Sequence, residues 1–178
     1  MEGSGTLGIM KHASSRMNGF LSCAVAEAIQ DSRFPIEEAS TKALTGVSIG
    51  CMSSNITKLT EFLEEANTKG PELINRLTMM HILSNIPAAT VSVKYGLQGP
   101  SGSSSTACAT GLTSVIEAYK WIRDGDAESA IAGGVEDVYN STCLFSSIRL
   151  QAMTTKQYEQ PEQSSRPFDE GRSGFVLG

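Results

Sequence analysis

The stretch SGSSSTACATGLTSVIEAYKWIRDG, residues 101–125, places one cysteine, Cys108, between a run of small residues and an amphipathic segment. Gly125 follows the last apolar residue of that segment and is a typical helix stop. Between Cys108 and Gly125, apolar residues recur at steps of three and four, which is the spacing of one buried helix face: Leu112, Val115, Ile116, Tyr119 and Ile122. The stretch therefore predicts a turn followed by a helix, with Cys108 at the helix N-terminus.

A cysteine at this position is suited to act as a nucleophile. Unpaired backbone N–H groups and the positive end of the helix dipole favour a thiolate over a thiol. The neighbouring residues are small, which leaves room for a substrate: Thr106, Ala107, Ala109, Thr110 and Gly111. The alternative is a structural cysteine, because free cysteine often packs as a small buried hydrophobic residue. The position of Cys108 in the sequence is compatible with a nucleophile and with a structural cysteine.

The rest of the chain alternates between helical and strand-like segments, without internal repeats. Apolar residues at helical spacing occupy 21–29, 59–63 and 73–80. The last of these helices is expected to begin at Pro71 and to end before Pro87. Short strands are expected at 44–49, 91–94 and 127–132. This alternation predicts an α/β fold with a mostly parallel sheet covered by helices.

Several motifs, in their order and spacing, resemble those of the β-ketoacyl-acyl carrier protein synthases. They are KYGLQGP (94–100), STACATG (105–111), GDA (125–127), AGGVE (132–136), SRPFD (165–169) and GFVLG (174–178). The cysteine motif is most similar to that of the fatty-acid elongating and mitochondrial forms. The resemblance implies a thiolase-like fold, of which residues 1–178 would be the N-terminal half of a layered αβαβα arrangement. The domain is then expected to be incomplete at both ends.

The resemblance also implies a function. Cys108 would take an acyl chain as a thioester from the phosphopantetheine arm of acyl carrier protein, with its own backbone N–H as half of an oxyanion hole. The acyl group would then be condensed with malonyl-acyl carrier protein, a step assisted in the family by two histidines of the C-terminal half. The isolated chain is therefore expected to lack condensing activity. Ala107, Cys143 and Phe145 are the expected substrate-binding residues.

The same resemblance implies the partners. Acyl carrier protein would deliver the substrates, so no cofactor bound to the chain itself is expected. A homodimer would form through the strand before the cysteine, within residues 101–107. A non-catalytic, truncated dimerisation or interaction module is the alternative, since a chain that lacks half of a fold can expose apolar sheet and helix faces.

Composition excludes some other classes of function. The 178 residues hold 14 Lys and Arg against 19 Asp and Glu, a net charge of −5, which does not fit the clustered positive charge of nucleic-acid binders. No apolar run approaches the roughly 20 residues of a membrane span. The four cysteines are widely spaced, which predicts neither disulfides nor a metal site. An intracellular protein is expected, with mitochondrion and cytoplasm both open.

Two further motifs suggest other activities. GSGTLG, residues 3–8, matches a dinucleotide-binding pattern but lacks a preceding strand, so nucleotide binding is not expected. GVSIG, residues 46–50, matches a hydrolase nucleophile elbow, which makes Ser48 a rival nucleophile with His81 as its base. His81 lies among apolar residues, which favours a packed histidine.

Charged residues near the motifs are expected to be structural. Glu136 and Asp137 follow two glycines and are adjacent, so their side chains should point apart. Arg166, Asp169 and Arg172 are expected to form local ion pairs within a loop.

Overall fold

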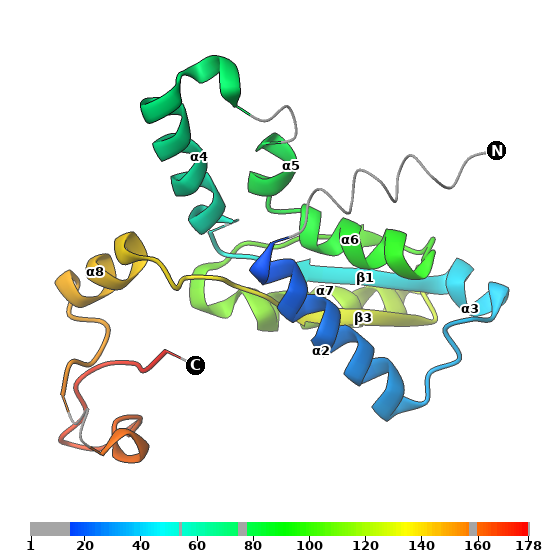
Figure 1. Cartoon of the computed structure of the whole chain (residues 1–178). Helices are drawn as coiled ribbons and strands as arrows, with labels where there is room; N and C mark the ends of the chain where they lie inside the picture. The colour runs from blue at the N-terminus through cyan, green and yellow to red at the C-terminus, as the bar shows by residue number, and fades with distance from the viewer. Residues whose placement is uncertain (1–14, 54, 75–77, 157–159, 178) are drawn as a thin grey trace. The chain divides into compact units, whose positions relative to one another are not determined.

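The computed structural model describes residues 15–53, 55–74, 78–156 and 160–177 (Figure 1). The chain divides into two compact units, and the boundary along the sequence falls between Asp137 and Val138. The helices and strands of the first are α2 (Arg16–Ser32), α3 (Ala39–Leu44), β1 (Thr45–Gly50), α4 (Ile56–Lys69), α5 (Thr78–Ile82), α6 (Ile86–Tyr95), β2 (Ser101–Gly102), α7 (Thr110–Asp124) and β3 (Ser129–Gly134). Its 3₁₀ turns are η1 (Pro71–Leu73) and η2 (Ala107–Ala109). The second unit contains α8 (Ser141–Arg149) and the 3₁₀ turn η3 (Pro161–Gln163).

A three-stranded parallel sheet lies at the centre of the first unit. The strand order is β2-β1-β3, and both neighbours of β1 run parallel to it. Val47 of β1 is paired with Ser101 on one side and with Ile131 on the other. Every residue of β1 is buried, as expected for a central strand covered on both faces. The predicted α/β fold with a parallel sheet is confirmed.

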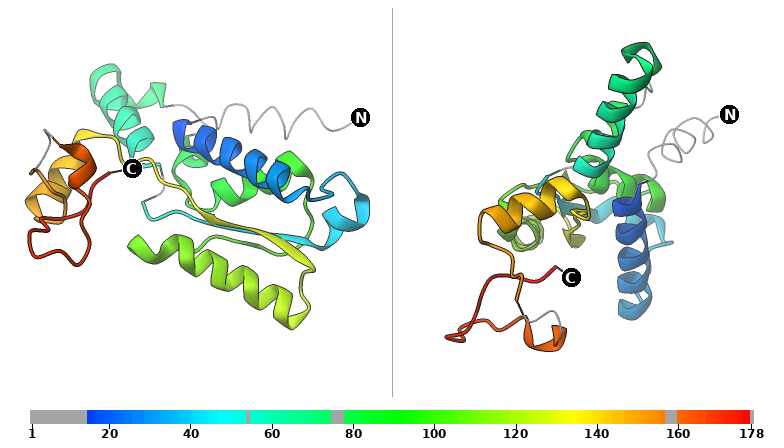
Figure 2. Two further views of the ribbon diagram at one scale, coloured as in Figure 1. Left: turned by 90° about the horizontal axis from the view of Figure 1, so that it is seen from below. Right: turned by 60° about the vertical axis from the view of Figure 1, so that its left-hand side comes forward.

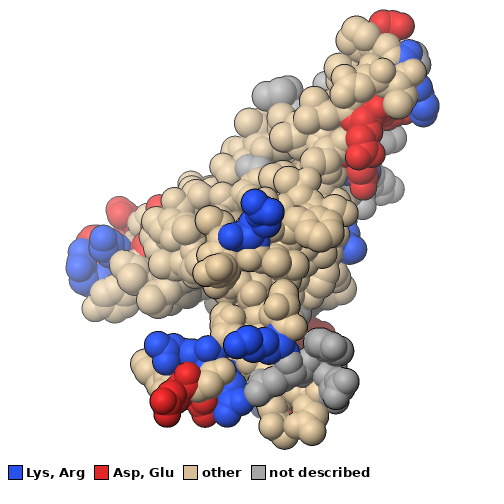
Figure 3. Space-filling view, turned by 90° about the vertical axis from the view of Figure 1, so that its left-hand side faces the viewer, with Lys and Arg blue, Asp and Glu red and all other residues tan. Residues whose placement is uncertain are grey.

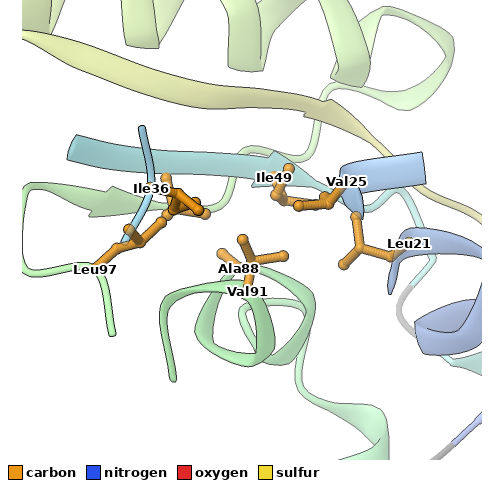
Figure 4. Close-up of a cluster of buried hydrophobic side chains, with 8 residues drawn as sticks. Leu21, Val25, Ile36, Ile49, Ala88, Val91 and Leu97 are labelled. Carbon is orange, nitrogen blue, oxygen red and sulfur yellow. The ribbon is translucent and has the colours of Figure 1, made fainter. Parts of the chain in front are cut away.

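One face of the sheet carries the hydrophobic core. Helices α2 and α6 lie on this face, whereas α7 lies on the opposite face (Figure 2). Side chains alternate along a strand, so Val47 and Ile49 both point to the α2 and α6 side. Figure 4 shows the core cluster, whose buried members are Leu21, Val25, Ile36, Val47, Ile49, Ala88, Val91 and Leu97. The predicted helix over 21–29 therefore contributes two buried residues to the core, Leu21 and Val25, and Ile29 packs against it partly buried.

The other face of β1 is made of small residues that allow α7 to approach closely. Cβ atoms built on Gly46 and Gly50 would come within 3.0 Å of Trp121 Cε3 and 2.7 Å of Ser114 Oγ, respectively. Between them Ser48, which shares this face, donates to Glu117 of α7. The glycines and serine of the GVSIG motif therefore serve helix-on-sheet packing.

The helix α7 forms where the sequence predicts it, but the predicted buried face is wrong. Leu112 and Tyr119 are 65% and 62% exposed, and the other three residues of the apolar stripe are exposed as well. The buried residues of α7 are the small ones, Thr110, Ser114 and Ala118. They face the sheet because the glycines and serine of β1 let the helix backbone approach closely, and Trp121 of the same helix packs against Gly46.

Two other local predictions are wrong. The segment 91–94 is the second half of α6 and not a strand, and Pro87 lies in the first turn of that helix instead of after a helix. Proline suits the first turn because its missing N–H would have no partner there. The single helix expected from Pro71 is replaced by η1 and, after the undescribed residues 75–77, by α5.

The surface agrees with the mixed charge of the sequence. On the face drawn in Figure 3, basic and acidic residues form small groups that are separated by uncharged surface. None of the helices within the described part of the chain is long and apolar enough to cross a membrane. The GSGTLG motif lies outside the described residues.

Candidate active site

Cys108 lies in a tight turn between β2 and α7. It is the middle residue of η2, which continues directly into α7 at Thr110, so its expected position at a helix N-terminus is confirmed. The residue before it, Ala107, has a φ of 51°, a left-handed conformation that is uncommon for residues other than glycine. Cys108 is exposed, and the alternative of a buried structural cysteine is therefore wrong.

The hydroxyl of Thr110 holds this turn in place. Its Oγ1 donates a 2.7 Å hydrogen bond to the Ala107 carbonyl and accepts a 2.8 Å bond from the Thr106 N–H. Thr110 is itself buried. One buried side chain therefore stabilises both the left-handed residue Ala107 and the residue before it, Thr106.

A recess of about 260 Å³ lies beside Cys108. It is formed where β1, β3 and the start of α7 meet. Its walls are made by Gly50, Met52, Ala107, Cys108, Thr110, Gly111, Gly134, Val135 and Glu136. Most of these residues are small, as expected from the sequence around the cysteine. The recess can therefore hold a group that is attached to the sulfur.

The two acidic residues after β3 have separate partners, as expected. Glu136 accepts hydrogen bonds from the backbone N–H groups of Met52 and Ser53, at 2.8 and 3.3 Å, and from Ser53 Oγ at 2.6 Å. Asp137 is buried, and its carboxylate pairs with the guanidinium of Arg16, whose Nε lies 3.0 Å from Oδ2. Neither carboxylate is placed as one of an acid–base pair.

The structure separates the rival nucleophile from any exposed site. Ser48 is completely buried, and its Oγ donates a 2.6 Å hydrogen bond to Glu117 Oε2. His81 is 7% exposed, and its ring lies 5.4 Å from the ring of Phe62. Neither residue lines the recess at Cys108. A buried serine bonded to a carboxylate is not available to a substrate, so the hydrolase interpretation of GVSIG is wrong.

The remaining expected site residues lie in the second unit. Cys143 and Phe145 belong to α8, and Phe145 is 66% exposed. Asn140 caps this helix by accepting a 2.9 Å hydrogen bond from the Cys143 N–H. The assignment of these two residues to substrate binding stays a prediction.

The loop around SRPFD contains the expected local contacts. Arg166 Nη2 donates to Asp169 Oδ2 at 3.0 Å, and Arg172 Nη1 donates to the Asp169 carbonyl at 3.0 Å. The Arg166 guanidinium, and then the hydrogen bond from the Gly171 N–H, lower the pKa of Asp169 below its ordinary value. The predicted ion pair of Arg166 with Asp169 is confirmed, whereas Arg172 contacts the backbone carbonyl of Asp169 and forms no ion pair with its carboxylate.

No metal centre is found in the part of the chain that the structure describes, where no three His, Cys, Asp or Glu side chains are placed to hold an ion.

The residues that the sequence did not assign to the site are the opposite walls of the recess, Gly50, Met52, Gly134, Val135 and Glu136. The signal that could have found them is the pairing of β1 with β3, since the carboxyl ends of neighbouring parallel strands meet at one edge of a sheet.

Comparisons with known proteins agree with this architecture. The family profile described as beta-ketoacyl synthase, N-terminal domain, matches residues 5–178. The chain is 37% identical over 160 residues to the mitochondrial 3-oxoacyl-[acyl-carrier-protein] synthase of Arabidopsis thaliana, covering 90% of the chain and 35% of that protein. It is 32% identical over 173 residues to 3-oxoacyl-[acyl-carrier-protein] synthase 2 of Staphylococcus aureus, covering 96% of the chain and 42% of the relative.

A solved structure is similar in fold. It is a type II polyketide synthase acyl-carrier protein in complex with its ketosynthase bound to the hexaketide, with a TM-score of 0.80 and 27% identity, over 92% of this chain and 41% of the other. The chain thus has the thiolase-like fold of the ketosynthases, and it spans between about a third and two fifths of the length of the curated relatives. The profile match covers nearly all of the sequence, and the chain therefore belongs to the β-ketoacyl synthase family, as an N-terminal domain.

Proposed function

We propose that the chain is the nucleophile-bearing part of a 3-oxoacyl-acyl carrier protein synthase of fatty acid biosynthesis. The observation that carries the proposal is the exposed Cys108 at the start of α7, beside a recess of about 260 Å³ with small walls. In the first step, the Cys108 sulfur forms a thioester bond with the acyl carbon, and the phosphopantetheine thiol leaves with a proton. The backbone N–H of Cys108 supplies one donor to the oxyanion.

In the second step, malonyl-acyl carrier protein loses carbon dioxide, and its carbanion attacks the thioester carbon and releases Cys108 as the thiolate. In the family, two histidines of the C-terminal half assist this step. The sequence has two histidines, His12 and His81, and His81 is buried against Phe62 and does not line the recess at Cys108. We therefore expect the 178-residue chain alone to complete acylation but not condensation. A 3-oxoacyl product formed by the purified chain would contradict this expectation. The substrates are carried on phosphopantetheine, so the proposed reaction needs no cofactor held by the chain.

The test is acylation by a thioester. The purified chain is incubated with octanoyl-acyl carrier protein, and the modified peptides are identified by mass spectrometry. We expect the octanoyl group on Cys108, its loss in C108A and its retention in C23A, because Cys23 is exposed in the middle of α2. Acylation of C108A at the rate of the unmodified sequence would reject the proposal.

Acyl carrier protein is the proposed partner. The solved ketosynthase described above is bound to an acyl-carrier protein, which supports the same kind of partner for this chain. Binding is measured by titrating acyl carrier protein that carries an unreactive pantetheine analogue against the C108A variant. Binding that is unaffected by removal of the phosphopantetheine arm would contradict a role in substrate delivery.

A second candidate function, self-association, is favoured by two exposed features. The strand β2 is an edge strand of the sheet in the first unit, with β1 on one side. The apolar stripe of α7 defined by Leu112, Val115, Ile116, Tyr119 and Ile122 is exposed. We propose that β2 pairs with its copy in a homodimer. Light scattering should show a dimer that S101P disrupts and C108A preserves, because proline removes a ladder donor.

The relatives indicate two alternatives for the cellular compartment. The Arabidopsis thaliana relative is named as mitochondrial and the Staphylococcus aureus relative is bacterial. We propose an intracellular site of action, with mitochondrion and cytoplasm as the two alternatives. Subcellular fractionation of cells that express the protein decides between them.

A further inference from the structure

The second unit contains a hollow, the basic hollow, whose charged lining residues are all cationic. It has a volume of about 830 Å³ and is formed by the segment after α8 and by residues between 165 and 176. Three of its lining residues are cationic and three have apolar side chains: Lys156, Arg166 and Arg172, and Pro167, Phe175 and Val176.

Only part of this positive charge is neutralised. Arg166 Nη2 pairs with Asp169 Oδ2 at 3.0 Å. Arg172 donates to the Asp169 carbonyl, and among the described residues neither Arg172 nor Lys156 forms a salt bridge. No acidic side chain in the described part of this unit lines the hollow. The basic hollow therefore presents two cations that have no carboxylate partner among the described residues.

The walls of the basic hollow are held by hydrogen bonds. The Phe175 N–H donates to the Ala152 carbonyl at 2.8 Å, which joins the two segments that form the hollow. Asp169 contacts both arginines, because its carboxylate accepts from Arg166 and its carbonyl accepts from Arg172. Side chains that are already held in place lose less conformational freedom when a ligand binds. The two guanidinium groups are therefore positioned to bind an anion.

We propose that the basic hollow binds a phosphate monoester with an apolar organic part. At neutral pH such a phosphate carries a charge of about −1.5 to −2, which matches the charges of Lys156 and Arg172. A guanidinium presents a planar fork of N–H donors that fits two phosphate oxygens. The hollow is larger than a bare phosphate and has the size of a small-molecule site, and its apolar walls contact the organic part.

The experiment is a titration of the full 178-residue chain with phenyl phosphate, which combines a phosphate with an apolar ring. The amide signals of Gly174 and Phe175, two residues of the hollow, are followed by NMR. We expect a saturable shift, with a dissociation constant about tenfold lower than that of inorganic phosphate, which has no ring to bury. Phenol has the ring without the charge and should bind at least about tenfold more weakly. The absence of a saturable shift, or equal binding of either reference compound, overturns the proposal.

Two variants test the cations. K156Q and R172Q should each raise the dissociation constant of phenyl phosphate about fivefold, the upper end of what one exposed ion pair contributes. An unchanged affinity in either folded variant overturns the proposal. Where the amide spectrum shows that R172Q is unfolded, K156Q decides alone, because among the described residues the Lys156 side chain makes no hydrogen bond that holds the loop.

The matched control is R149Q. Arg149 is the remaining cationic residue of the second unit, lies in the last turn of α8 and does not line the hollow. R149Q removes the same charge at a different place, so its dissociation constant should stay within about twofold of the original value. Weakening by R149Q equal to that by R172Q would mean that the overall charge of the unit, and not the hollow, attracts the anion, and it overturns the proposal.

Benzoate tests the class of the anion. It has the same ring, but it carries one negative charge on a carboxylate in place of the phosphate. We expect it to bind about fivefold more weakly than phenyl phosphate, because one charge interaction is lost. Equal binding of benzoate would assign the hollow to carboxylates and overturn the proposed preference for phosphate.

Binding in the hollow is independent of the acylation of Cys108. Cys108 lies in the first unit and does not line the hollow, so C108A should bind phenyl phosphate with the affinity of the unmodified sequence. A chain that binds phenyl phosphate but takes no octanoyl group from its carrier rejects the proposed function alone. A chain that is acylated at Cys108 but does not bind phenyl phosphate rejects the phosphate site alone.

Discussion

Gly50, the last residue of β1, lies directly against Thr110, the first residue of α7. A Cβ placed on Gly50 would overlap the Thr110 methyl group and come within 2.9 Å of the Ser104 carbonyl. Thr110 in turn holds the Ala107 carbonyl and the Thr106 N–H. The position of the Cys108 turn therefore depends on the absence of a side chain at the end of the central strand.

The first prediction follows from this contact. G50A should lower the free energy of unfolding by about 1–3 kcal/mol through overpacking, and it should also slow acylation of Cys108. The matched control is G133A in β3, because a Cβ at Gly133 meets nothing within 4 Å. Urea unfolding measures both variants. Equal stabilities of G50A and G133A would contradict the close approach.

The second prediction concerns the reactivity of three cysteines, Cys108, Cys23 and Cys51. Cys108 and Cys23 are both exposed, but only Cys108 lies at a helix N-terminus. Iodoacetamide should label Cys108 at least about twofold faster than Cys23, the lower end of what a helix N-terminus contributes. Cys51, which is completely buried, should stay unlabelled until the chain unfolds. Peptide mass spectrometry resolves the sites, and equal labelling of Cys108 and Cys23 would contradict an activated thiol.

The third prediction tests the buried serine. S48A removes the donor of the 2.6 Å bond to the Glu117 carboxylate and should lower the free energy of unfolding by about 1.5–3 kcal/mol. S103A removes a neutral bond, from Ser103 Oγ to the Ser84 carbonyl, and should cost about 0.5–1.5 kcal/mol. Acylation of Cys108 should persist in both. Labelling of Ser48 by a fluorophosphonate in the folded chain would support the hydrolase interpretation instead.

The fourth prediction concerns acid. The Arg166 guanidinium and the Gly171 N–H favour the charged Asp169, so its pKa in the folded chain is lowered. The stabilisation of this loop by Asp169 should therefore be complete above the unfolded pKa of about 3.9 and be lost as the pH falls through the lower folded value. The amide chemical shift of Gly171 follows the titration by NMR.

Two variants separate the causes of this shift. R166Q should raise the midpoint of the titration towards the ordinary value, because it removes the largest cause. R172Q should change it less, since Arg172 donates to the Asp169 carbonyl and not to its carboxylate. A midpoint at or above about 3.9 in the unmodified chain would contradict the prediction.

Local signals were sufficient to predict the elements around the cysteine. The periodicity after Cys108 and the stop at Gly125 predict α7, and Gly125 indeed has the left-handed conformation of a helix C-cap, with a φ of 84°. The strand expected at 44–49 is also observed, as β1, and it contains the whole GVSIG motif. These features depend on residues that are close in the sequence, so a single sequence is enough to predict them.

The features that were not predicted depend on contacts between distant segments. Apolarity alone predicts the wrong face of α7, because the close approach to the glycines of β1 places Ser114 and Trp121 against the sheet. The sequence pattern does not predict helix α6, because Pro87 suits the end of one helix and the first turn of another equally well. The contact of Glu136 with Met52 joins residues that are 84 positions apart, and no local pattern in the sequence indicates it.

The exposed apolar stripe of α7 has a consequence for handling the protein. Sulfate and similar salts are excluded from protein surfaces and strengthen the association of apolar groups. The chain should therefore precipitate at lower ammonium sulfate concentrations than a domain of similar charge whose helices cover their leucines and tyrosines, and a chaotropic anion should keep it dispersed.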